Sequence, residues 1–391
     1  RCCNLDPVEW YKNMIMAIYK PFKEAGKKLI IRDFIYTKAE QERFQKAFME
    51  MPEEIVLSLK NTPHDFYPTF PDNPLMGKVG EHPQITEYDV NGQFFGWGVQ
   101  PSAMLSDIKR RLKYGKEHKV SGFLARTDWE GVQDWTCFDN LNMVNLYAIA
   151  AYADNENISE EEIYLRWLQG EHLINDELSP GELKNCVKQI KEIMDATWTI
   201  VEKTNFVNGC LFSNDSCMHL TPEQFTFIGG THHSLSEWDP EKKDALEMSP
   251  DNIMKIVSDK EDAYIACEKL VSLVEAGNMG LKETAYQKMK EHFEFMRWYV
   301  RGFRLTARGY CFGRYVTEKD ETEILLERKT ASQLLNETID EMETYKEGLL
   351  QTSFISKYPF DAQLNPERVE FYINALKKML IEGKKYDSNR N

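Results

Sequence analysis

In the first part of the chain, segments with the hydrophobic spacing of a helix alternate with short apolar runs typical of a strand. Apolar side chains three or four positions apart predict amphipathic helices over residues 8–26, 37–51, 102–118 and 140–153. Thr37 and Ser102 are the expected N-caps of the second and third helices. Short apolar runs predict strands near residues 28–36, 54–60, 84–90 and 119–126. Strands that alternate with helices indicate a parallel sheet with right-handed crossovers.

From about residue 153 the strand signals stop and long helical patterns take over. Ser159 with Glu162, and Ser179 with Glu182, have the spacing of capping boxes at helix starts. Further helices are expected to begin at Ser249 and to cover residues 281–312, 322–350 and 365–382. Residues 205–248 read as an irregular insert. We therefore predict two domains, an α/β domain over residues 1–152 and an α-helical C-terminal domain over residues 153–391.

Four parallel strands fit either half of an eight-stranded (β/α) barrel or a small doubly wound sheet. In both architectures ligands bind at the carboxyl ends of the strands. Polar and aromatic residues gather at these ends in the sequence: Arg32, Lys60, Asp65, Glu87, Arg126, Asp128 and Trp129. The sequence thus predicts a site at this edge of the sheet.

The residue types at the strand ends suggest chemistry on an acidic sugar. Asp65 follows one strand and Glu87 lies in the next, and two such carboxylates can activate one water, as an inverting glycosidase requires. Lys60 and Arg32 suit a substrate carboxylate or phosphate. Trp129 and Trp135 could be platforms for sugar rings, and loop packing is an equal alternative for each. Ion pairs are common at strand ends, so residue types alone favour a structural cluster.

The composition of the chain argues against several classes of binding partner. The formal net charge of -15 argues against a general nucleic-acid binder, although it leaves room for a small basic pocket. No segment has the apolar length of a membrane helix. The eight cysteines are irregularly spaced and read as buried thiols, and the histidines, including His232 and His233, lack zinc spacing, so neither metal nor cofactor is predicted. The chain begins with Arg1, so its natural start is expected upstream, which leaves the compartment open between cytoplasm and periplasm.

Five blocks in residues 11–170 resemble the α-glucuronidases of glycoside hydrolase family 67. "KNTPHDFYP" is similar to that family's strand-end motif Lys-Asn-Gly-Pro-x-Asp-Phe-Gln-Pro, and "QITEYDVNGQFFG" is similar to the segment that follows it. "NMIMAIYKPF" and "LIIRDFIY" resemble the preceding helix and strand. "DWTCFDNLNMVNLYAIAAYADNENISEEEIYLRWL" resembles the passage into the helical domain.

This resemblance implies the second half of a (β/α)8 TIM barrel followed by a C-terminal helical domain that mediates a homodimer. Members are inverting enzymes that release glucuronic acid, often 4-O-methylated, from xylan-derived oligosaccharides. By resemblance, Asp65 and Glu87 activate the water, Arg32 and Lys60 hold the uronate, and Trp135 borders the pocket. The family's general acid lies upstream of anything in this chain.

Departures from the family pattern leave alternatives open. Tyr67, Thr69-Phe70 and Cys137-Phe138 replace residues of the family's pocket wall, which puts the particular uronic acid in question. The first hypothesis is an α-glucuronidase-like glycosidase that acts on an acidic oligosaccharide. The second is a non-catalytic carbohydrate-binding or scaffolding relative, and a third treats residues 153–391 as an interaction domain.

Overall fold

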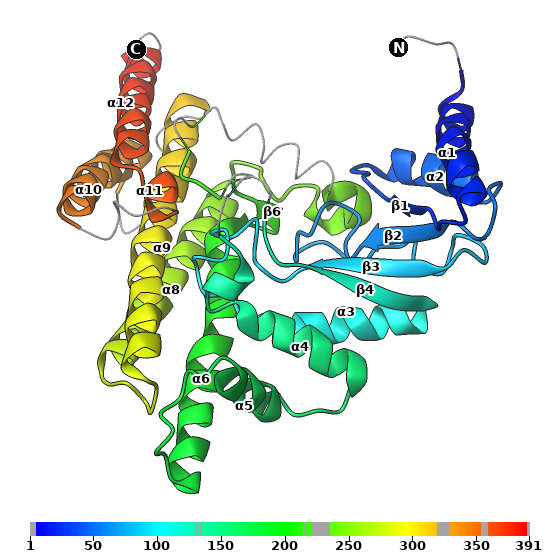
Figure 1. The fold of residues 1–391 in the computed structure, drawn as a ribbon. Coiled ribbons are helices and arrows are strands. Elements are labelled where there is room, and N and C mark those ends of the chain that lie inside the picture. The colour runs from blue at the N-terminus through cyan, green and yellow to red at the C-terminus, as the bar shows by residue number, and fades with distance from the viewer. Residues whose placement is uncertain are drawn as a thin grey trace.

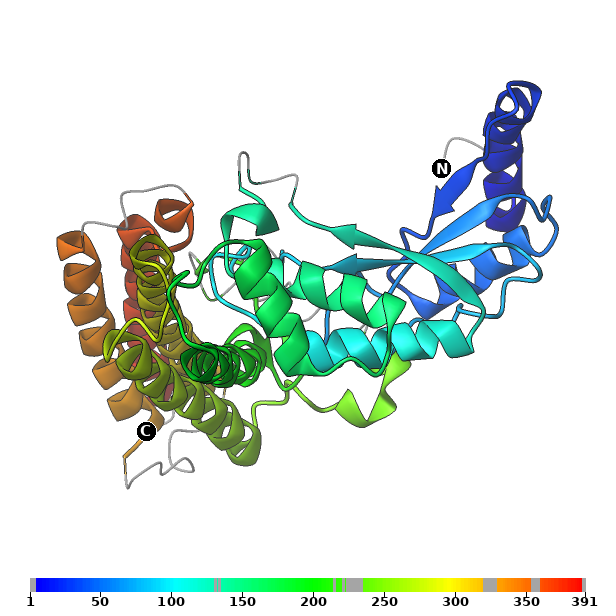
Figure 2. The same ribbon diagram turned by 60° about the horizontal axis from the view of Figure 1, so that its bottom comes forward.

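The computed structural model describes residues 5–129, 132, 135–213, 216–219, 222, 235–318, 329–352 and 359–388. A sheet with its helices forms one part, and a bundle of long helices forms the other (Figure 1). Turned by 60°, the molecule shows the two parts side by side, with α1 and α12 at opposite ends (Figure 2). The chain therefore has a mixed α/β part followed by a helical part.

Four strands form one parallel sheet in the order β1-β2-β3-β4, with bounds β1 (Ile30–Arg32), β2 (Val56–Lys60), β3 (Gln84–Asp89) and β4 (Val120–Arg126). The parallel four-stranded sheet predicted from sequence is confirmed. Strands and helices alternate except between β2 and β3, which are joined by a loop without a helix. Within the described residues the sheet is open, because β1 and β4 each have one strand neighbour. A closed barrel is not formed by these residues alone.

The helices of the sheet part are α1 (Pro7–Glu24), α2 (Lys38–Phe48), α3 (Leu105–Glu117) and α4 (Met143–Asp154). Thr37 caps α2 as predicted, because its side chain accepts a hydrogen bond from the Glu40 amide. The prediction for Ser102 is wrong. α3 has Met104 at its N-cap, and the Ser102 amide instead donates to the side chain of Asn142 at 2.8 Å.

The helical part contains α5 (Glu160–Gly170), α6 (Pro180–Asn205), α8 (Pro250–Glu275), α9 (Glu283–Glu318), α10 (Ala331–Gln351), α11 (Phe360–Gln363) and α12 (Pro366–Ser388). Ser179 and Glu182 form a complete capping box, and the Ser159 side chain accepts from the Glu162 amide. A short hairpin, β5 (Phe206–Val207) with β6 (Cys210–Leu211), and the short helix η3 (Pro240–Lys242) lie between α6 and α8. No described helix has the length and apolarity needed to cross a membrane.

Two apolar clusters hold these elements together. One lies between α1, α2 and the first strands and includes Ile15, Phe48 and Leu57. The other begins beside the sheet and continues into the helical bundle, with members from Phe66 to Leu380. Because α4, α5 and α6 share this second core with α8 and α9, the helical part is packed against the sheet part and can fix loops at their junction.

Candidate active site

The carboxyl ends of the first three strands bring together the charged residues singled out in the sequence. Arg32 ends β1, Lys60 ends β2, and Glu87 lies two residues before the end of β3. The strand register pairs Lys60 with Glu87 across β2 and β3. Since parallel strands share one carboxyl edge, these side chains meet at a single edge of the sheet.

Glu87 is held by two protein donors. Its Oε2 accepts from Arg32 Nε at 2.7 Å, and its Oε1 accepts from the Ser58 hydroxyl at 2.7 Å. The Glu87 side chain is 8% exposed, whereas that of Arg32 is 38% exposed. The carboxylate is therefore fixed in direction, and the guanidinium remains accessible beside it.

Asp65 and Lys60 form a second ion pair. Here the carboxylate is the more exposed partner, whereas in the pair of Arg32 and Glu87 the cation is. The Lys60 side chain is 0% exposed, and its Nζ lies 3.3 Å from Asp65 Oδ1 and 3.4 Å from the Ile35 carbonyl oxygen. The rings of Phe34 and Tyr36 lie 5.0 and 4.8 Å from the same nitrogen. Asp65 is 17% exposed and is thus the member of this pair that reaches solvent.

The proline-rich loop after β2 turns sharply at Asp65, whose φ is +45°. Aspartate adopts this left-handed conformation more readily than most residues, but the surroundings must stabilise it. The Thr62 hydroxyl donates to the Asp65 carbonyl at 2.7 Å. His64 packs against the rings of Tyr36 and Tyr67, and burial lowers its pKa to about 3. A neutral, half-buried His64 fits a role in orienting the loop.

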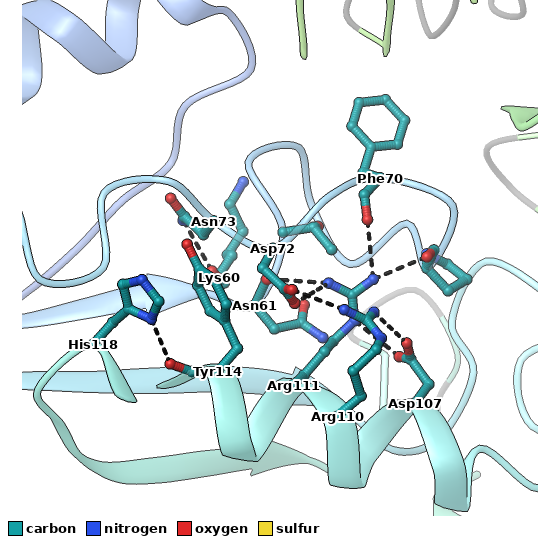
Figure 3. Close-up of polar contacts among 12 residues, drawn as sticks. Lys60, Asn61, Phe70, Asp72, Asn73, Asp107, Arg110, Arg111, Tyr114 and His118 are labelled. Carbon is teal, nitrogen blue, oxygen red and sulfur yellow. Dashed lines mark hydrogen bonds and ion pairs between the residues drawn. The ribbon is translucent and has the colours of Figure 1, made fainter. Parts of the chain in front are cut away.

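Arg111 ties this loop to α3 (Figure 3) and was not singled out in the sequence. Its guanidinium donates to the carbonyl oxygens of Asn61, Pro68 and Phe70 at 3.4, 2.9 and 3.0 Å. It also donates to Asp107 and Asp72 at 2.9 and 3.0 Å. One buried cation thereby fixes both ends of the segment that carries Asp65.

Asp33 lies behind the site and was also missed. Its Oδ1 accepts from the Lys60 amide at 2.7 Å, and its Oδ2 accepts from Asn73 Nδ2 at 2.9 Å. Burial raises the pKa of Asp33 to about 7, and the nearby Lys60 charge opposes this rise. Asn73 also donates to the Lys60 carbonyl at 2.9 Å. Asp33 and Asn73 together therefore hold the backbone of Lys60 at the end of β2. A polar residue directly after a strand was the available sequence signal.

The tryptophans from the sequence prediction lie in a cluster at the junction with the helical part. Trp135 Nε1 donates to the Trp97 carbonyl at 2.9 Å, and its ring stacks on His292 at a centroid distance of 5.9 Å. The Trp129 ring lies 5.4 Å from that of Trp97. Both residues are partly buried against Trp97, so each has a packing role, and sugar binding by either stays a prediction.

The described residues contain no group of three or more His, Cys, Asp or Glu side chains placed to hold a metal ion. His232 and His233 lie outside the described residues, as do Cys2 and Cys3. The other six cysteines are buried, and burial raises the pKa of Cys137 and Cys311 to about 12. These two thiols are therefore protonated at neutral pH and are poor nucleophiles.

Comparison with known proteins shows that the fold of this chain is similar to that of a solved structure. No protein-family model and no curated protein matches the chain. Among solved structures, a GH138 enzyme targeting pectin rhamnogalacturonan II is similar, with a TM-score of 0.55 and 13% sequence identity. The match covers 98% of this chain and 60% of that chain. The chain thus resembles part of a glycoside hydrolase in fold, and membership of family 67 stays a prediction.

Proposed function

We propose that this chain carries the water-activating side of a glycoside hydrolase that removes a uronic acid from an acidic oligosaccharide. The observation that carries the proposal is the placement of two carboxylates at the carboxyl edge of a parallel sheet, where Glu87 pairs with Arg32 and Asp65 pairs with Lys60. The likeness of nearly the whole chain to a glycoside hydrolase in fold supports the same class of reaction.

In the proposed mechanism Asp65 and Glu87 orient one water for a single displacement, which inverts the anomeric configuration. Glu87 keeps its orientation through Arg32 and Ser58, so the water meets an acceptor of fixed direction. Asp65 is the second acceptor and is held by Lys60. The leaving group would take its proton from a third carboxyl group, which the family resemblance places upstream of residue 1.

Recognition of the uronate falls first to Arg32. Its side chain is accessible while its Nε is engaged by Glu87, so the terminal nitrogens of its planar fork suit a substrate carboxylate. Direct contact between Lys60 and the substrate stays a prediction. Its buried ammonium already lies beside Asp65, and we propose that it mainly positions that carboxylate.

We further propose that the four strands are one half of a (β/α)8 barrel. β1 has an open edge among the described residues, and an exposed apolar stripe runs along α1 at Trp10, Met14, Ile18 and Phe22. Open edges and large apolar patches are usually covered in soluble proteins. Further β/α units packed against β1 and α1 would cover both.

The uronic acid itself is left open between two candidates. The sequence motifs resemble α-glucuronidases, which act on glucuronic acid. The enzyme of the similar solved structure targets rhamnogalacturonan II. By its name, a rhamnogalacturonan contains galacturonic acid. Both sugars carry the same C6 carboxylate, so Arg32 would serve either one.

The test is hydrolysis by the protein as its gene encodes it. Aldouronic acids and aryl α-uronides of both sugars are compared with the matching neutral aryl glycosides, and NMR follows the first anomer released. We expect uronic acid release with inverted configuration and far slower release of neutral sugars. Binding without turnover would support the carbohydrate-binding alternative, and a retained anomer would contradict the single displacement.

A further inference from the structure

Phe34 is an exposed aromatic residue that follows β1, at the edge of the sheet where the candidate site lies. It is 60% exposed. The centroid of its ring lies 5.5 Å from the Arg32 guanidinium carbon and 5.0 Å from Lys60 Nζ. These two cations hold Glu87 and Asp65, the proposed water-activating pair. The ring is therefore beside both ion pairs and open to a ligand that reaches them.

The residues on either side of Phe34 are anchored in the fold. Asp33 is 1% exposed, its amide donates to the Ser58 carbonyl at 3.0 Å, and its carboxyl group accepts from the Lys60 amide at 2.7 Å. Ile35 is 4% exposed and belongs to the apolar cluster between α1, α2 and the first strands. Because both neighbours are buried, Phe34 is held with its side chain facing outward, and a ligand that covers it needs to order little of the protein.

Phe66, Trp129 and Trp135 are less accessible than Phe34. The Phe66 ring centroid lies 5.9 Å from the Arg32 guanidinium carbon, but this residue is 4% exposed. Trp129 and Trp135 are partly buried in the cluster at the junction with the helical part. A single exposed apolar residue is common on protein surfaces, so exposure alone does not identify a site. Phe34 is distinguished by its position beside the cations of both proposed catalytic carboxylates.

We propose that Phe34 is the platform on which the pyranose ring of the uronic acid stacks. This inference rests on the proposed function and adds a contact to the sugar ring to the charge contact of Arg32 with the carboxylate. One face of a pyranose presents C–H groups that are slightly positive, and the face of an aromatic ring is slightly negative, so the two attract while both are removed from water. A sugar stacked on Phe34 can place its C6 carboxylate at Arg32, the cation beside the same ring.

Titration calorimetry with the methyl α-uronides of galacturonic and glucuronic acid tests the platform. For a uronide that binds the natural protein, Phe34→Ala should weaken binding about 5- to 10-fold, as expected for the loss of one aromatic contact. Phe34→Trp should bind nearly as tightly as the natural protein. NMR of the bound sugar gives a direct readout, because the ring current of an aromatic face shifts the signals of protons above it. The sugar C–H signals should move upfield with the natural protein and much less with Phe34→Leu, which keeps an apolar side chain without a ring.

Ile30→Ala is the matched control, because Ile30 is 53% exposed at the opposite end of β1. This variant should bind the uronide as the natural protein does. In urea unfolding both alanine variants should be nearly as stable as the natural protein, since each removes an exposed side chain.

The NMR comparison begins with the natural protein, so a misfolded variant cannot imitate the result. Absence of the upfield shift, or unchanged affinity in Phe34→Ala, would overturn the platform and leave the proposed function standing. A Phe34→Ala protein that fails to fold would also overturn it, because the ring would then be packed against protein. Failure of the natural protein to bind either uronide would overturn both proposals.

Discussion

Replacing Arg111 by methionine should destabilise the protein through the loop that carries Asp65. Methionine keeps an apolar side chain of similar reach but donates no hydrogen bond. The carbonyl oxygens of Pro68 and Phe70 lose their Arg111 donor, and each buried polar group left unsatisfied costs about 1–3 kcal/mol. The Asn61 carbonyl oxygen still accepts from the Asn73 amide at 3.1 Å. The Asn61 contact is long at 3.4 Å and contributes least. We expect a loss of roughly 3–5 kcal/mol in the free energy of unfolding.

Arg110 provides a matched control on the same helix. It pairs with the same carboxylates, Asp72 at 2.8 Å and Asp107 at 2.7 Å, but its side chain is 51% exposed, against 1% for Arg111. Arg110→Met therefore removes charge contacts of the same kind without leaving buried carbonyl groups unpaired. Exposed ion pairs contribute about 0–1 kcal/mol, so this variant should be nearly as stable as the natural protein.

Equilibrium urea unfolding of both variants, followed by circular dichroism, measures the difference. If the two variants lose similar stability, charge at this position and not carbonyl capping anchors the loop, and the reasoning fails. Turnover of an aryl uronide gives a second readout. In Arg111→Met it should fall below that of Arg110→Met even under conditions where both variants are fully folded, because the anchored loop positions Asp65.

Two other substitutions test the chemistry at the strand ends. Arg32→Gln should weaken binding of a uronide about 10-fold or more while leaving the matching neutral glycoside nearly unchanged, and calorimetry with both ligands would show a structural role if the losses are equal. Asp65→Asn and Glu87→Gln should each lower the turnover number by orders of magnitude with little change in substrate binding. Their combined loss should be smaller than additive because both serve one water, and additive losses in a double-mutant cycle would contradict a shared water.

Much of the sheet part was predictable because its strands are short apolar runs set off by recognisable helices or, between β2 and β3, by a proline-rich loop. Gln84–Asp89 forms a strand where residues 84–90 were expected, and α2 starts at its expected cap. Ser102 failed as a cap because a local residue preference was outweighed by a long-range contact, the buried side chain of Asn142. Sequence periodicity also could not show that α4 to α6 share one core with the later helices, since that depends on which faces meet.

The residues of the candidate site that lie at strand ends could be predicted from the sequence. The residues that support them from elsewhere in the fold could not. Glu87 and Arg32 could be placed at one edge because parallel strands share it. Arg111 and Asp33 were missed because their importance comes from burial and from backbone groups far away in sequence. The buried state of Lys60 depends on the rings of Phe34 and Tyr36, whose positions no local pattern specifies.

Asp33 offers a pH-dependent test of how the site is supported. Its carboxyl group holds a proton up to about pH 7 in the folded chain because of burial, whereas an unfolded aspartate releases it near its ordinary pKa of about 3.9. Between these values the folded state binds more protons, so this group's contribution to stability falls as pH rises from about 4 to about 7. Three pKa units correspond to roughly 4 kcal/mol at most. Asp33→Asn removes the titration and adds a constant cost, because its amide would face the Asn73 amide donor. The unfolding free energy of the natural protein minus that of the variant should therefore decrease across this interval. A difference that stays constant or increases with pH would show that Asp33 is ionised throughout and paired with Lys60.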